Sequence, residues 1–88
     1  MTEQKVTVTN RAGIHARPAA LLVQATKDLK CNIYFERDTE RINAKSIMGV
    51  ITLGAAYGTE VNIIADGEGE EAAVQTLVRL FESKFEEE

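Results

Sequence analysis

The stretch Gly13-Ile14-His15-Ala16-Arg17-Pro18-Ala19-Ala20 marks the start of a helix and holds the only histidine of the chain. Pro18 fits the first turn of a helix, where its missing N–H is tolerated. The unpaired N–H groups of a helix start carry partial positive charge and attract anions, phosphate in particular. Arg17 adds a planar guanidinium that matches phosphoryl oxygens, and the imidazole of His15 is a nucleophile that can carry a phosphoryl group covalently.

The patterns on either side of this stretch predict an α+β fold. Residues 5–9 alternate with period two, as a half-buried strand does, and residues 32–37, 40–43 and 59–65 are further predicted strands. Helices are predicted from residue 16 to about 29, over 44–54, and from about 69 to 85. The order β-α-β-β-α-β-α predicts two layers, and the length predicts a single domain over residues 1–88.

Helical spacing divides these helices into core and surface sides. Core positions of the first and last helices are Ala19, Leu22, Val23, Thr26, Leu29, Ala73, Val74, Leu77, Phe81 and Phe85. In the middle helix, Ser46 is a natural N-cap and Gly54 a natural stop. Its inward positions are predicted to be Ile47, Val50, Ile51 and Leu53, with Met48 and Thr52 facing elsewhere.

The outer side of the first helix carries Arg17, Ala20, Leu21, Gln24 and Lys27. Ala20 and Leu21 are apolar residues that the core does not use. They indicate either a docking face for partners or scattered surface hydrophobes, and the helical spacing alone favours neither reading.

The turn between the second and third predicted strands has an unfavourable sequence for a tight type. Asp38-Thr39 lies between the second and third predicted strands. Because Thr39 is β-branched and disfavours positive φ, a tight two-residue turn is less favourable here than with Asn-Gly.

Composition excludes several classes of protein. The net charge of −4 gives no general affinity for nucleic acid. Cys31 is the only cysteine, so no intramolecular disulfide forms; it is read as a small buried hydrophobe, and no Cys/His cluster exists for a metal. No signal region and no run of membrane-spanning length occurs, so the chain is expected in the cytoplasm without membrane insertion.

Two motifs, residues 13–19 and Asn43-Ala44-Lys45-Ser46-Ile47-Met48-Gly49, resemble the HPr family of histidine-containing phosphocarriers. These proteins serve the bacterial phosphoenolpyruvate-dependent sugar phosphotransferase system. The resemblance covers essentially the whole chain, and two motifs at compatible separation make it specific. It implies an open-faced β-sandwich, in which a four-stranded antiparallel sheet of order 1-4-2-3 is covered by three helices.

The resemblance also implies roles for particular residues. His15 would accept a phosphoryl group on Nδ1 from phosphorylated Enzyme I and donate it to the A domains of sugar permeases, with Arg17 holding the phosphoryl oxygens. Ser46 would be a regulatory site for an ATP-dependent serine kinase and the matching phosphorylase. Such a carrier is not an enzyme and needs no cofactor or metal. The implied docking surface comprises Ile47 and Met48 and supports the same role for Ala20, Leu21, Gln24 and Lys27.

Two other functions are compatible with these motifs. A regulatory HPr-like protein would act through phosphorylated Ser46 on a catabolite-control repressor, and the two roles can coexist in one chain. The corresponding paralogue lacks the active histidine, so His15 favours a carrier. A nitrogen-related branch of the system fits Ser46-Ile47-Met48-Gly49 less well. Ala12 replaces a small polar residue of many relatives, and Gln24 replaces a basic residue common in enteric members.

Overall fold

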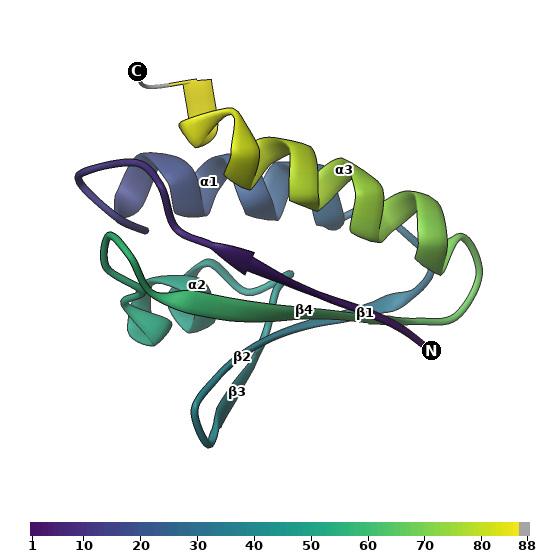
Figure 1. Cartoon of the computed structure of the whole chain (residues 1–88). Coiled ribbons are helices and arrows are strands. Elements are labelled where there is room, and N and C mark those ends of the chain that lie inside the picture. Colours follow the sequence, from purple (N-terminus) through teal and green to yellow (C-terminus); the bar gives the residue numbers. More distant parts are fainter. Residues whose placement is uncertain (87–88) are drawn as a thin grey trace.

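The computed structural model describes residues 1–86 and has the predicted order of elements. The elements are β1 (Thr2–Thr7), α1 (Ala16–Thr26), β2 (Asn32–Arg37), β3 (Glu40–Asn43), α2 (Ile47–Leu53), β4 (Glu60–Asp66), α3 (Glu70–Glu82) and the short 3₁₀ helix η1 (Lys84–Glu86). The strands form one antiparallel sheet in the order β1-β4-β2-β3, with α1 and α3 side by side along it (Figure 1). The predicted fold and strand order are confirmed.

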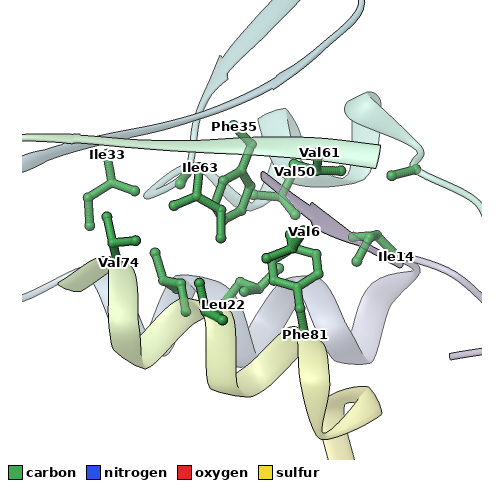
Figure 2. Packing of buried hydrophobic residues seen from close by; sticks show 14 of the residues in the cluster. Val6, Ile14, Leu22, Ile33, Phe35, Val50, Val61, Ile63, Val74 and Phe81 are labelled. Atoms are coloured by element: carbon green, nitrogen blue, oxygen red, sulfur yellow. The ribbon is translucent and has the colours of Figure 1, made fainter. Parts of the chain in front are cut away.

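The core fills the space between the sheet and the helices (Figure 2). Alternate residues of the strands meet the inward sides of all three helices there, as the period-two and helical patterns predict. Phe35 of β2 meets Phe81 of α3 edge to face, with ring centroids 5.9 Å apart. Phe85 meets Phe81 at 5.0 Å. Burying each such side chain stabilises the fold by roughly 1.5–3 kcal/mol.

The first helix is shorter than predicted, because it ends at Thr26 and not near Leu29. Thr26 is completely buried, and its hydroxyl lies 3.2 Å from the carbonyl oxygens of both Val23 and Ala44. A threonine that bonds to nearby carbonyls competes with the helical ladder. Val23 and Leu29 still pack against the core, although both are only partly buried.

The inward assignment of the middle helix is wrong for two residues. Ile47 is 42% exposed and Ile51 is 39% exposed, whereas Val50 and Leu53 are buried. A helix of two turns offers the core a stripe one residue wide, and this stripe is the 50–53 pair. Met48, predicted to face elsewhere, is 67% exposed.

Two further strand details differ from expectation. The first strand begins at Thr2 and ends at Thr7, while Val8 still donates a 2.9 Å hydrogen bond to the Thr59 carbonyl. The β2–β3 turn has two residues, because Asp38 takes the positive φ of 54° and Thr39 does not. Aspartate tolerates the left-handed region better than β-branched residues do.

Candidate functional site

The loop before α1 is fixed by a buried asparagine that the sequence did not single out. Asn10 is 0% exposed, and its Nδ2 donates to the Gly13 carbonyl over 2.8 Å. In return, the Gly13 N–H donates to the Asn10 carbonyl at 3.1 Å, which closes a turn. An asparagine just after a strand is a usual turn former, and this was the only local signal available.

The same loop rests directly on the segment between α2 and β4. The N–H of Ile14 donates to the carbonyl of Ala55 over 2.8 Å. Gly13 has φ +72°, and a Cβ built there would lie 2.8 Å from the Ala55 oxygen and 3.0 Å from the Cα of Ala56. Only glycine allows both this backbone conformation and this close approach.

His15 is the N-cap of α1, in extended conformation at φ −108° and ψ −162°. Its side chain is exposed and makes no capping hydrogen bond to the helix. The Ala19 N–H already donates to the His15 carbonyl at 3.0 Å, and Pro18 has no N–H. The N–H groups of Ala16 and Arg17 therefore supply the donors at this helix start. Arg17 is exposed in the first turn, so the structure brings the predicted imidazole, guanidinium and helix start together.

Ser46 is the exposed N-cap of α2, as the sequence predicted. Its Oγ accepts a hydrogen bond of 3.1 Å from the Gly49 N–H. The turn before it is closed by the Ser46 N–H, which donates to the Asn43 carbonyl at 3.1 Å. The serine hydroxyl thus belongs to a helix cap and is open to solvent at the same time.

The six predicted docking residues lie on α1, at its C-cap and on α2, and the two helices contact each other. Ala20 is half-buried and Gln24 is exposed on α1, and Lys27, the C-cap residue of this helix, is also exposed. Leu21 is half-buried and packs against the core, so the prediction that the core does not use it is wrong. The exposed side chains on α2 are Ile47, Met48 and Ile51. Ile51 was missed, because its helical spacing resembles that of a core residue.

Charge divides sharply between this region and the remainder of the chain. Residues 8–27 and 42–59, which we name the basic region, contain the helices and loops just described. Their charged residues are Arg11, Arg17, Lys27 and Lys45, with no carboxylate. All 14 Asp and Glu residues lie elsewhere in the sequence. An acidic chain therefore has only basic charges in the two segments that contain His15 and Ser46.

The carboxylate of Glu70, at the start of α3, holds the beginning of β1. Glu70 accepts hydrogen bonds from the Thr2 hydroxyl at 2.5 Å and the Gly67 N–H at 3.1 Å, and the Met1 amino group lies 2.9 Å away. The Thr2 hydrogen bond, followed by the others, lowers the pKa of Glu70 to about 2. This arrangement joins the first strand to the last helix.

Two negative observations apply to residues 1–86. No group of three or more His, Cys, Asp or Glu side chains in this range could hold a metal ion. No helix in the same range is long and apolar enough to cross a membrane.

Comparison with known proteins agrees with this geometry. The family model described as "PTS HPr component phosphorylation site" matches residues 2–83. The chain is 51% identical to the phosphocarrier protein HPr of Treponema pallidum over 88 residues, the full length of both. It is 46% identical to the HPr-like protein Crh of Bacillus subtilis over 77 residues, covering 88% of this chain and 91% of that protein.

A solved structure extends the likeness to three dimensions. The crystal structure of HPr-C-His from Thermoanaerobacter tengcongensis superposes with a TM-score of 0.95 at 46% identity, covering 100% of this chain and 99% of that one. The chain belongs to the HPr family of the phosphotransferase system, whose members carry phosphoryl groups and do not themselves catalyse a reaction.

Proposed function

We propose that His15 is the residue that carries the phosphoryl group, and that it takes the group from phosphorylated Enzyme I and passes it to the A domains of sugar permeases. The observation that carries this proposal is the exposed imidazole at the start of α1, on a loop whose backbone is fixed by Asn10 and Ala55. We place this exchange in the cytoplasm.

The chemistry requires only a neutral ring and a held phosphoryl group. The lone pair on Nδ1 of His15 attacks phosphorus, the bond between phosphorus and the donor atom breaks, and the donor keeps that electron pair. Arg17 and the N–H groups of the helix start stabilise the negative phosphoryl oxygens during and after transfer. Onward transfer repeats the same displacement with the imidazole as leaving group.

A carrier must also release its cargo, and the exposure of the site suits this need. Helix-end and exposed ionic interactions each contribute about 0.3–1 kcal/mol. Such interactions favour the phosphorylated form without trapping it. A buried site with every oxygen paired would hold the group much more tightly.

Half-buried apolar residues of α1 and exposed ones of α2 supply the docking face for both partners. Ala20, Leu21, Ile47 and Met48 give apolar contact area beside His15, and Gln24 and Lys27 form a polar margin. The absence of carboxylates from the basic region favours partners whose surface is acidic.

Ser46 is proposed as a regulatory phosphorylation site for an ATP-dependent kinase, reversed by a phosphorylase. Its hydroxyl is exposed, and Ile47 and Met48 follow it directly. A phosphate adds about −2 charge, which would repel acidic partners from the docking face without unfolding the protein. The similarity to Crh supports a second role, in which phosphorylated Ser46 binds a catabolite-control repressor.

The test uses two donors. Wild-type protein incubated with Enzyme I and phosphoenolpyruvate is expected to gain an acid-labile, alkali-stable phosphate. His15→Ala should lose this label and keep the acid-stable label that a serine kinase adds from ATP, and Ser46→Ala should behave in the opposite way. Ser46→Asp should weaken the productive encounter with Enzyme I. A wild-type protein that takes no label from Enzyme I would overturn the carrier proposal.

A further inference from the structure

Exposed large apolar side chains are concentrated in one segment of the molecule. Met1 lies apart from the others; those within residues 47–57 are Ile47 at 42% exposure, Met48 at 67%, Ile51 at 39% and Tyr57 at 65%. The first three lie on α2, in or beside the docking face proposed above. Tyr57 lies beyond the end of α2, in a loop that neither the sequence motifs nor the proposed function uses. A ring with this exposure offers a binding partner a large, amphipathic contact area.

The backbone presents Tyr57 rigidly. The Thr59 N–H donates to the Ala56 carbonyl at 3.0 Å, so residues 56–59 form a β-turn with Tyr57 at its corner. Gly58 supplies the positive φ of +86° in this turn, and its N–H donates to the Val8 carbonyl at 2.8 Å. The corner position of such a turn accepts most residue types, so the turn itself does not require an aromatic ring.

This turn is adjacent to the loop that carries His15. Ala55 accepts the hydrogen bond from Ile14, and the Cα of Ala56 lies against Gly13. Ala56, which directly precedes Tyr57, therefore contacts Gly13, which lies two residues before His15. A partner that reacts with His15 must bring its phosphoryl group within bonding distance. Because each partner of a standard interface buries about 800 Å², the footprint extends well past the reacting atoms.

We propose that Tyr57 anchors the proteins that exchange a phosphoryl group with His15, by inserting its ring into an apolar recess on an acidic partner surface. This inference rests on the proposed carrier function. The docking face then continues from α2 through residues 54–58 and flanks the active loop. Continuity with the α2 face supports it, as does the absence of any carboxylate from residues 42–59. Tyrosine is enriched among the residues that dominate interface energies, and a ring held on a fixed turn loses little freedom on binding.

The experiment compares a protein donor with a small one. Phosphorylation of Tyr57→Ala by phosphorylated Enzyme I is expected to show a KM about five- to tenfold higher than wild type. Phosphoramidate phosphorylates an imidazole directly, with release of ammonia, and needs no docking surface. The rate with phosphoramidate should equal that of wild type. Gln75→Ala, a change of an exposed α3 residue, is the matched control and should leave both rates unchanged.

Each other outcome has a defined meaning. If Enzyme I labels the wild-type protein and Tyr57→Ala has the same KM, this inference is overturned and the carrier proposal stands. Equal slowing with both donors would assign Tyr57 to the geometry of the active loop and also overturn it. A wild type that Enzyme I does not label overturns the carrier proposal and this inference with it. Should the alanine variant melt early, Tyr57→Gln, which keeps a long side chain at the corner, replaces it with the same expectations.

Discussion

The starts of α1 and α2 have similar backbones and opposite chemistry. His15 and Ser46 are both exposed N-caps in extended conformation, with φ −108° and φ −102°. Ser46 uses its side chain on its own helix, where Oγ accepts from the Gly49 N–H. His15 makes no such bond. An imidazole that capped the helix would commit a ring nitrogen to it, whereas the His15 ring makes no capping bond.

The fold compensates for this at His15 through the backbone. The loop before His15 is held by the Asn10 side chain and by the Ala55 carbonyl, neither of which touches the helix's own N–H groups. The position of His15 is thus fixed by contacts to the residues that precede it, and the N–H groups at the start of α1 remain available to an anion. The Ser46 side chain both caps α2 and forms part of the surface, so a modification of its hydroxyl changes the helix cap and the surface together.

The largest expected effect comes from His15→Ala. Acceptance of the phosphoryl group should be lost completely, because the nucleophile is removed. Stability should change by less than about 0.5 kcal/mol, since no side-chain cap is lost. Urea unfolding and phosphate labelling measure the two quantities. His15→Asp sharpens the comparison, because a capping carboxylate should raise stability by about 0.5–1 kcal/mol while transfer stays absent. If both variants are less stable than wild type, the His15 side chain contributes to the start of α1 and the contrast with Ser46 is wrong.

Gly13→Ala should have the next largest effect, because it disturbs the backbone contact that positions His15. Strain at positive φ and the contact with the Ala55 oxygen together should cost about 2–3 kcal/mol. Gly69→Ala is the control. That glycine has φ +77° with nothing within 4 Å of a built Cβ, so only about 1 kcal/mol is expected. Phosphoryl transfer should slow for Gly13→Ala only. If urea unfolding gives the same loss of stability for both variants, the contact with the Ala55 oxygen adds nothing to the cost of strain.

Arg17→Ala should slow phosphoryl transfer by about tenfold, because one charge-assisted contact to the phosphoryl group is lost. Its exposed side chain contributes little to folding, so the melting temperature should stay close to wild type. Arg17→Lys keeps the charge without the planar fork and should fall between the two. Rapid-quench kinetics with phosphorylated Enzyme I give the rates. A loss of melting temperature that parallels the loss of rate would assign Arg17 to the fold.

Ser46→Ala should lower stability by about 1 kcal/mol, because the Gly49 N–H loses its side-chain acceptor. Transfer through His15 should be unaffected in this variant. Ser46→Asp keeps an acceptor at the cap, so its stability should stay near wild type. Denaturation curves of the three proteins decide the matter: if Ser46→Ala is as stable as wild type, the cap has no energetic role.

The smallest effect concerns the start of α3, where Glu70 lies in the first turn. Its pKa falls from an ordinary value of 4.5 to about 2 in the folded protein. The ionised carboxylate therefore adds stability that is complete above pH 4.5 and is lost as the pH falls toward 2. Glu70→Gln should flatten the acid side of the stability profile. Glu71→Gln, one residue along, is the control and should keep the wild-type slope in urea titrations between pH 2 and 6.

Local patterns predicted most of the fold, the start of α1 and the Ser46 cap. Strand alternation, Pro18 and Ser46 each act within a few residues, so the sequence carries their signals directly. The contact between Gly13 and Ala55 joins loops about forty residues apart, and no local pattern shows it. The exposure of Ile47 and Ile51 depends on how a two-turn helix lies against its neighbours, which periodicity alone does not settle. Tyr57 was missed for the same reason, because its importance comes from what lies next to its turn.

The uneven distribution of charge along the chain also acts before a partner makes contact. Residues 8–27 and 42–59 carry basic side chains without a carboxylate, although the net charge of the whole chain is −4. The field of an acidic partner attracts these two segments and repels the carboxylates elsewhere, so more collisions begin with His15 toward the partner. The range of this attraction is the Debye length, about 8 Å at physiological ionic strength and about 3 Å in molar salt.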